Sequence, residues 1–103
     1  MTRLAQLRQM LAEEPADAFL RYAISVELAA QGNRTEAIEN VQQLIADQPD
    51  YLGAYYQLGQ WLEQEGKNDE ALQIYRTGAQ LATKTGNKKT LGELNEAIWL
   101  LED

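Results

Sequence analysis

The sequence of 103 residues contains no cysteine and no histidine, and only two prolines. Without cysteine it can form neither a disulfide framework nor a thiolate metal site. The commonest general acid–base side chain and the commonest thiol nucleophile are therefore both missing. The two prolines, Pro15 and Pro49, leave most of the chain free to form helices. These absences favour a helical protein without catalytic chemistry.

Long apolar runs are absent too, and acidic residues outnumber basic ones by 16 to 9, for a formal net charge of −7. No segment resembles a signal peptide or is apolar enough to span a membrane, so we expect a cytoplasmic protein with no membrane partner. An acidic surface repels phosphate backbones, which argues against nucleic acid as a ligand. The small basic cluster of Lys84, Lys88 and Lys89 is interpreted as a solvated loop between helices.

The remaining candidates for chemistry are weak. Ser25 lies within a predicted helix and has no evident base beside it. The pairs Glu36/Glu39 and Glu93/Glu96 are one helical turn apart and could in principle bind a hard cation, but such pairs are usually solvated faces. No glycine-rich phosphate loop is present. We therefore predict no enzyme activity, no cofactor and no metal site.

What the chain does contain is an internal repeat of 34 residues, which is typical of helical repeat arrays. The residues that recur at this offset are Pro15 with Pro49, Leu28 with Leu62, Gly32 with Gly66, and Ala37 with Ala71. Several coincidences at one offset are hard to obtain by chance in so short a chain. The repeat therefore predicts two equivalent units, residues 18–51 and 52–85, within a single domain.

Each unit is expected to fold as two helices, because apolar residues recur at helical spacing on both sides of a central glycine. The predicted ranges are 18–31 and 35–47 in the first unit, and 52–65 and a helix from about 69 in the second. The flanking segments 2–14 and 88–102 show the same spacing and complete an array of about five antiparallel helices. Asn33 and Thr35 are candidate N-caps, and Asp69 can help to start the helix that follows it. Gly59, Ala71 and Gly78 are small enough to let antiparallel helices approach closely.

This pattern resembles the tetratricopeptide-repeat family. The second unit carries Tyr55-x2-Leu58-Gly59-x2-Leu62 followed by Ala71-x3-Tyr75. Two departures are Arg21, in a slot that is often aromatic, and Thr83, where a third proline is expected. The resemblance covers nearly the whole chain and implies an all-α, right-handed solenoid of helix pairs. It also implies a concave groove, lined by the first helix of each pair, that binds a peptide or helix of another protein.

Residues of the first helices that lie off the packing stripe are the candidates for this groove. They are Phe19, Tyr22 and Val26 in the first unit, Tyr56, Gln60 and Glu63 in the second, and Leu94 in the last helix. Tyr22 and Tyr56 occupy equivalent positions, and tyrosine combines apolar area with a polar tip. The alternative is that Phe19, Tyr22 and Val26 pack beneath segment 2–14.

The groove lacks the paired lysines and asparagines with which some members of the family hold a C-terminal carboxylate. An apolar or mildly basic segment fits it better, because Glu63 and neighbouring acids would attract it.

Two tryptophans remain. Trp61 is expected to pack between units, with a projecting anchor as the alternative. Trp99 either covers the last helix pair or leaves an apolar end that promotes self-association. The leading hypothesis is a protein-interaction module, and the alternative is a repeat protein whose function is to form a homo-oligomer.

Overall fold

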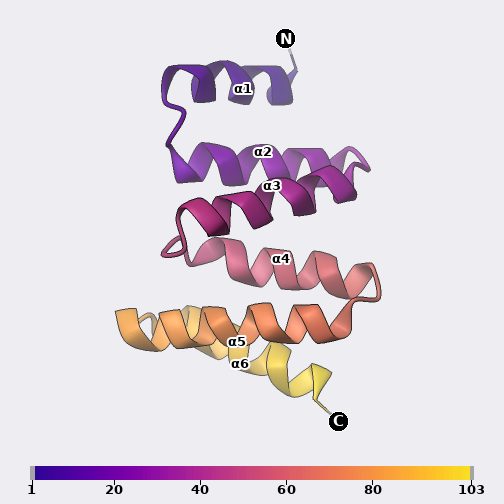
Figure 1. The fold of residues 1–103 in the computed structure, drawn as a ribbon, viewed down its shortest axis with the longest axis vertical. Coiled ribbons are helices and arrows are strands. Elements are labelled where there is room, and N and C mark those ends of the chain that lie inside the picture. Colours follow the sequence, from indigo (N-terminus) through magenta and orange to yellow (C-terminus); the bar gives the residue numbers. More distant parts are fainter. Residues whose placement is uncertain (1, 103) are drawn as a thin grey trace. The chain divides into compact units, whose positions relative to one another are not determined.

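The computed structural model describes residues 2–102, and within them it contains six helices and no strand (Figure 1). The helices are α1 Arg3–Glu13, α2 Ala18–Ala30, α3 Arg34–Asp47, α4 Gly53–Gln64, α5 Asn68–Thr85 and α6 Lys88–Leu101. The predicted all-α architecture is confirmed, and the predicted ranges account for all six helices. The expected count of about five was one too low.

The chain falls into two compact units, residues 1–49 and 50–103. In the first unit, α2 packs along α3, and α1 covers part of α2. Polar side chains start two of these helices: Thr2 accepts a hydrogen bond from the Ala5 amide at 3.1 Å, and Asp17 accepts one from the Leu20 amide at 3.0 Å. The core of this unit is aliphatic: Leu7, Leu20, Ile24, Leu28, Ala37, Ile38, Val41 and Leu44 are buried.

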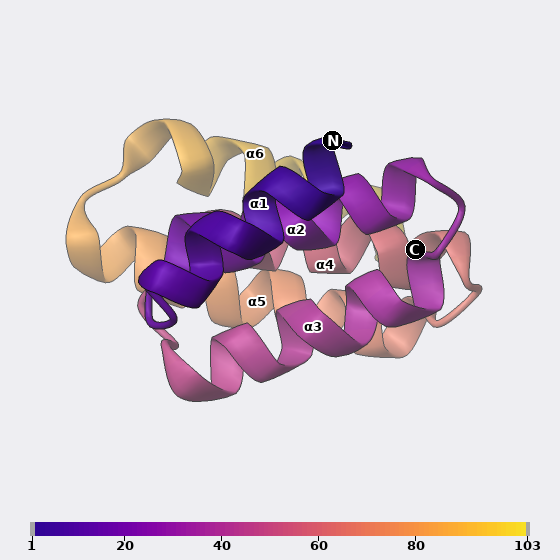
Figure 2. The same cartoon turned by 90° about the horizontal axis from the view of Figure 1, so that it is seen from above.

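In the second unit, α5 packs against both α4 and α6. Figure 2 shows α5 and α6 joined by a tight turn at one end of this unit. Its core includes two tyrosines: Tyr55, Leu58, Trp61, Leu62, Ala71, Tyr75 and Leu94 are all buried. Trp61, expected to pack between units or to project as an anchor, has an exposed fraction of 5% and therefore does not project.

The turns between paired helices are built alike in the two units. Gly32 and Gly66 have φ angles of +87° and +75°, a left-handed conformation that glycine adopts without steric cost. The residue after each glycine closes the turn: the Asn33 amide donates to Leu28 O at 2.9 Å, and the Lys67 amide donates to Leu62 O at 2.8 Å. Asn33 and Asp69 stand at the helix starts that the sequence predicts, whereas the other candidate cap, Thr35, lies inside α3. Asn33 is the N-cap of α3 but makes no capping hydrogen bond through its side chain, and Asp69 lies in the first turn of α5.

Two glycines of the second unit make room for tyrosine rings. A Cβ atom on Gly59 would lie 2.1 Å from Cε1 of Tyr75, and one on Gly78 would lie 2.7 Å from Cβ of Tyr55. The small residues therefore do more than let helix backbones approach, because each accommodates an aromatic side chain. The equivalent positions in the first unit, 34 residues earlier, hold Ser25 opposite the smaller Val41.

The start of α6 continues a regular series. The helices α2, α4 and α6 begin at Ala18, Gly53 and Lys88, so each starts 35 residues after the previous one. By position, α6 therefore corresponds to the first helix of a third pair, after the two complete pairs α2–α3 and α4–α5.

Candidate functional site

The predicted groove residues of the first unit lie on α2 and differ in exposure. Phe19 has an exposed fraction of 62% and Val26 of 38%, whereas Tyr22 is half-buried. Phe19 and Val26 therefore do not pack beneath α1. Both offer exposed apolar side chains to a partner.

In the second unit, three predicted residues of α4 meet α6 around a hollow of about 270 Å³. We call it the α4–α6 hollow. It is lined by Tyr56, Gln60 and Glu63 from α4 and by Glu93, Glu96, Ala97 and Leu100 from α6. Helix α5, which packs against both, holds α4 and α6 in position.

A hydrogen-bonded tyrosine supports the α4 side of the hollow. The Tyr75 hydroxyl donates to Oε2 of Glu63, and Nε2 of Gln60 donates to the Tyr75 hydroxyl at 2.6 Å. The rings of Tyr56 and Tyr75 lie with their centroids 6.1 Å apart, at an interplanar angle of 40°. Because Tyr75 is fully buried, these contacts fix the orientation of Glu63 and Gln60 before any ligand binds.

Burial and the neighbouring Glu63 carboxylate both raise the pKa of Tyr75 above its usual value. The phenol therefore remains neutral and continues to donate its proton to Glu63 at physiological pH. The Glu63 carboxylate keeps a defined hydrogen-bond partner on its core side, so its other lone pairs are available to the hollow.

The charge around the hollow has one sign. Glu63, Glu93 and Glu96 contribute carboxylates, and no lysine or arginine is among its lining residues. The rest of the lining is largely apolar, from Tyr56, Ala97 and Leu100. A lysine or arginine side chain has matching chemistry, because its methylene stem packs on apolar surface while its cationic head binds carboxylates.

One predicted groove residue lies elsewhere. Leu94 has an exposed fraction of 0% and packs beside Gly78, where a Cβ would be 3.2 Å from its Cδ1 atom. Leu94 therefore belongs to the core, and Glu93, Glu96, Ala97 and Leu100 of the same helix line the hollow instead. Sequence reasoning interpreted Glu93 and Glu96 as a solvated face. The sequence signal for this placement is the 35-residue spacing of the helix starts, which marks α6 as a helix equivalent to α4.

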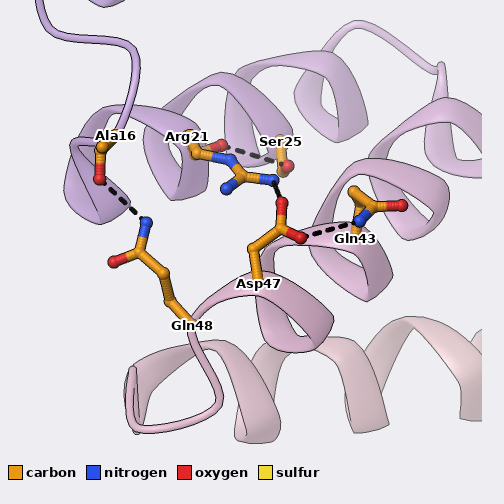
Figure 3. A network of polar contacts seen from close by, with 6 residues as sticks. All are labelled: Ala16, Arg21, Ser25, Gln43, Asp47 and Gln48. Atoms are coloured by element: carbon orange, nitrogen blue, oxygen red, sulfur yellow. Dashed lines mark hydrogen bonds and ion pairs between the residues drawn. The ribbon is translucent and has the colours of Figure 1, made fainter.

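A polar network in the first unit explains the unusual arginine of the repeat (Figure 3). Arg21 of α2 donates to Oδ2 of Asp47 at 2.9 Å, and Gln43 donates to Oδ1 of the same carboxylate at 3.0 Å. The hydrogen bond from Arg21, followed by that from Gln43, holds the pKa of Asp47 below its usual value. Gln48 donates to Ala16 O at 2.8 Å nearby. The network joins the start of α2 to the end of α3, so Arg21 links the helix pair through polar contacts where an aromatic residue would pack.

Among residues 2–102, no group of three or more acidic side chains is placed to hold a metal ion. No helix in that range is long and apolar enough to cross a membrane.

Comparison with known proteins identifies relatives of the same architecture. The tetratricopeptide-repeat family model matches residues 28–86. The solution structure of a tetratricopeptide-repeat domain protein from Salinibacter ruber is 35% identical, with a TM-score of 0.82 over 85% of this chain and 89% of that one. A crystal structure from the same organism gives 34% identity and a TM-score of 0.79, over 82% of this chain and 94% of that one.

A protein from Bordetella parapertussis shares the fold at 23% identity, with a TM-score of 0.82 over 98% of this chain and 88% of that one. No protein with a curated description matches the chain.

Proposed function

Because the chain belongs to the tetratricopeptide-repeat family, we propose that it is a protein-interaction module whose α4–α6 hollow binds a basic side chain of a partner segment. Proteins of this family generally mediate contacts between proteins and generally act as scaffolds without catalysis.

The observation that carries the proposal is the fixed carboxylate of Glu63 within a hollow of uniformly negative charge. A site whose hydrogen bonds are formed in advance does not spend binding energy on ordering itself. The apolar wall of Tyr56 and Leu100 supports the stem of the bound side chain, and the carboxylates of Glu93 and Glu96 lie across from Glu63 to complete the cation site. Partner binding should therefore combine apolar contact with charge-assisted hydrogen bonds.

For the first unit we propose that Phe19, Tyr22 and Val26 contact apolar side chains of the same partner. Phe19 and Val26 are exposed apolar side chains, so they favour contact with aliphatic or aromatic groups. A cytoplasmic location stays a prediction from the sequence.

The proposal can be tested by NMR titration with two synthetic peptides. One is an alanine-based peptide with Leu-Arg-Leu at its centre, and the other carries citrulline, the neutral isostere of arginine. We expect the arginine peptide to shift amide signals of α4 and α6 and to bind about tenfold or more tightly than the citrulline peptide, a difference of about 1.4 kcal/mol. Its affinity should fall as salt is added, because rim charges are screened.

Two sets of variants make the test specific. Glu63→Gln/Glu93→Gln/Glu96→Gln removes the charge of the hollow and should abolish the preference for arginine. The control, Glu13→Gln/Glu39→Gln/Glu70→Gln, removes the same net charge from exposed positions on α1, α3 and α5. If both triple variants weaken binding equally, the attraction is a property of the whole acidic surface and the hollow is not the site.

A further inference from the structure

Helix α6 has a second exposed surface that the hollow does not use. Lys88, Gly92, Asn95, Trp99 and Glu102 are all exposed and follow one another at alternating spacings of four and three residues. This spacing places them along one face of the helix, and it is the spacing of a seam between two packed helices. We call these five residues the outer stripe of α6. The hollow is lined by other α6 residues, including Glu93, Glu96 and Leu100.

Trp99 is the first unusual feature of the outer stripe. Its exposed fraction is 74%, higher than that of any other exposed large apolar residue in the described chain. Tryptophan carries a large apolar area and is among the residues most enriched at the energetic centres of protein interfaces. An indole left exposed to water in the last turn of a regular helix points to a surface that is covered in an assembly.

Gly92 is the second unusual feature of the outer stripe. It lies within α6, where glycine is unfavourable relative to alanine, and its φ is not among the positive values of the chain. A Cβ atom added to it would meet no heavy atom within 4 Å, so no packing contact inside the chain requires glycine there. Trp99 lies seven positions after Gly92, which is about two helical turns and places both on the same face of the helix. Because Gly92 has no side chain, a flat aromatic ring from another molecule can lie directly against the backbone of α6 there.

The charges at the two ends of α6 are the third unusual feature. Lys88 and Lys89 stand in the first turn and Glu102 follows the last, so each end carries the same sign as the helix dipole there. Within the described residues no ion pair involves Lys88 or Lys89, whereas Glu102 pairs with Arg76. An antiparallel α6 from another molecule would bring the opposite dipole end and the opposite charge to both ends of the helix. A parallel one would bring like charges together.

From these observations we propose that two copies of the chain associate through the outer stripes of α6, packed antiparallel about a twofold axis beside Asn95. In this register Trp99 of each copy lies on Gly92 of the other, and the first turn of each α6, with its two lysines, lies beside the end of the other α6, where Glu102 stands. The interface is self-complementary, as a twofold dimer requires. The hollow is lined by another face of α6, so the dimer would present two hollows that remain open to partners.

The interface consists of two helices of 14 residues each, which is small for a protein complex. Small interfaces give weak association, so we expect a dissociation constant in the micromolar to millimolar range. Sedimentation equilibrium over a wide range of concentrations measures it. Acrylamide quenching supplies a second readout, because Trp99 is exposed and Trp61 is buried, with an exposed fraction of 5%. Dimer formation should protect Trp99, and the total emission should become less quenchable as concentration rises.

Two variants separate loss of association from loss of folding. Trp99→Ala should raise the dissociation constant about tenfold or more, as expected for a central interface tryptophan. Gly92→Gln should raise it by a similar factor while raising the melting temperature of the monomer, because glutamine is the better helix former. Met10→Ala, which truncates another exposed apolar side chain, on α1, should leave association unchanged.

A charge exchange tests the antiparallel register. K88E/K89E and E102K should each fail to self-associate, because each places like charges opposite one another. An equimolar mixture of the two should form heterodimers, since the opposite charges then meet at both ends.

A wild-type protein that stays monomeric at the highest concentration overturns the proposal. So does association that survives both Trp99→Ala and Gly92→Gln, association that Met10→Ala weakens equally, or a mixture that associates no better than its components.

Discussion

Replacing Gly59 with alanine should strongly destabilise the second unit. In an exposed helix the same change stabilises by up to about 1 kcal/mol, because alanine is the better helix former. At Gly59 the added Cβ would lie 2.1 Å from Cε1 of Tyr75 and 2.6 Å from two further ring atoms. Carbon atoms normally approach to about 3.5–4.0 Å, so the ring or the helix must move by more than about 1 Å.

The tyrosine ring is held in place by its surroundings. Tyr75 is fully buried, and its hydroxyl is hydrogen-bonded to both Glu63 and Gln60. Overpacking of this kind costs about 1–3 kcal/mol. Displacing the ring also weakens a hydrogen bond to a charged group, which is worth about 1.5–3 kcal/mol. After the gain in helix propensity is subtracted, we expect a net loss of about 2–3 kcal/mol.

The assay is thermal and urea unfolding followed by far-UV circular dichroism, at concentrations low enough to keep the protein monomeric. The melting temperature should fall by roughly 10–20 °C, given about 4–8 °C per kcal/mol for a domain of this size. Gly92→Ala is the matched control, because a Cβ at that position meets no heavy atom within 4 Å. It should stabilise the protein by about 0.5–1 kcal/mol.

A second background isolates the contact itself. In a Tyr75→Leu protein the ring is absent, so adding Gly59→Ala should cost little or nothing further. The reasoning is refuted if Gly59→Ala is as stable as the wild type, or if its penalty persists unchanged in the Tyr75→Leu background.

Three further predictions concern the core and the titrating groups. Ala71→Leu should cost about 1–3 kcal/mol in urea unfolding, because Ala71 is fully buried in a packed helix pair; an unchanged midpoint would contradict the assigned register. The lowered pKa of Asp47 contributes stability that is present above the ordinary carboxyl pKa and is lost as pH falls through the pKa of the folded state. The difference in stability between wild type and Asp47→Asn, measured from urea midpoints, should therefore shrink on acidification. The raised pKa of Tyr75 has the opposite consequence: its contribution is intact below about pH 10, the unfolded value, and declines above it. Tyr75→Phe should therefore lose less stability than wild type in alkaline melts, though some loss remains because burial raises the pKa of Tyr55 as well.

The helices could be predicted from the sequence because the repeat fixes their order and spacing. Proline and glycine mark the helix ends, and every predicted range lies within a few residues of its helix. The side-chain details were less accessible. The side chain of Asn33 makes no capping hydrogen bond with α3, whereas its backbone amide closes the end of α2 by donating to Leu28 O.

The candidate site was predicted only on its α4 side. Tyr56, Gln60 and Glu63 line the hollow, but the α6 side depends on how far that helix is rotated about its axis. That rotation is set by Gly78, whose lack of a side chain lets Leu94 pack into the core. A pattern of apolar spacing gives the helix but not this rotation, so Leu94 was assigned to the groove, and the position of the exposed Glu93 at the hollow was missed.

The pairing of Gly59 with Tyr75 also limits how such repeats can be recombined. At the two equivalent positions the first unit has Ser25 and Val41, so each unit carries its own matched set of small and large side chains. A chimera that took Tyr75 from one unit and Ser25 from the other would join a large ring to a position with no room for it. Averaging the two units into a single idealised repeat would meet the same conflict. In any longer array built from this chain, these two positions must therefore be inherited together.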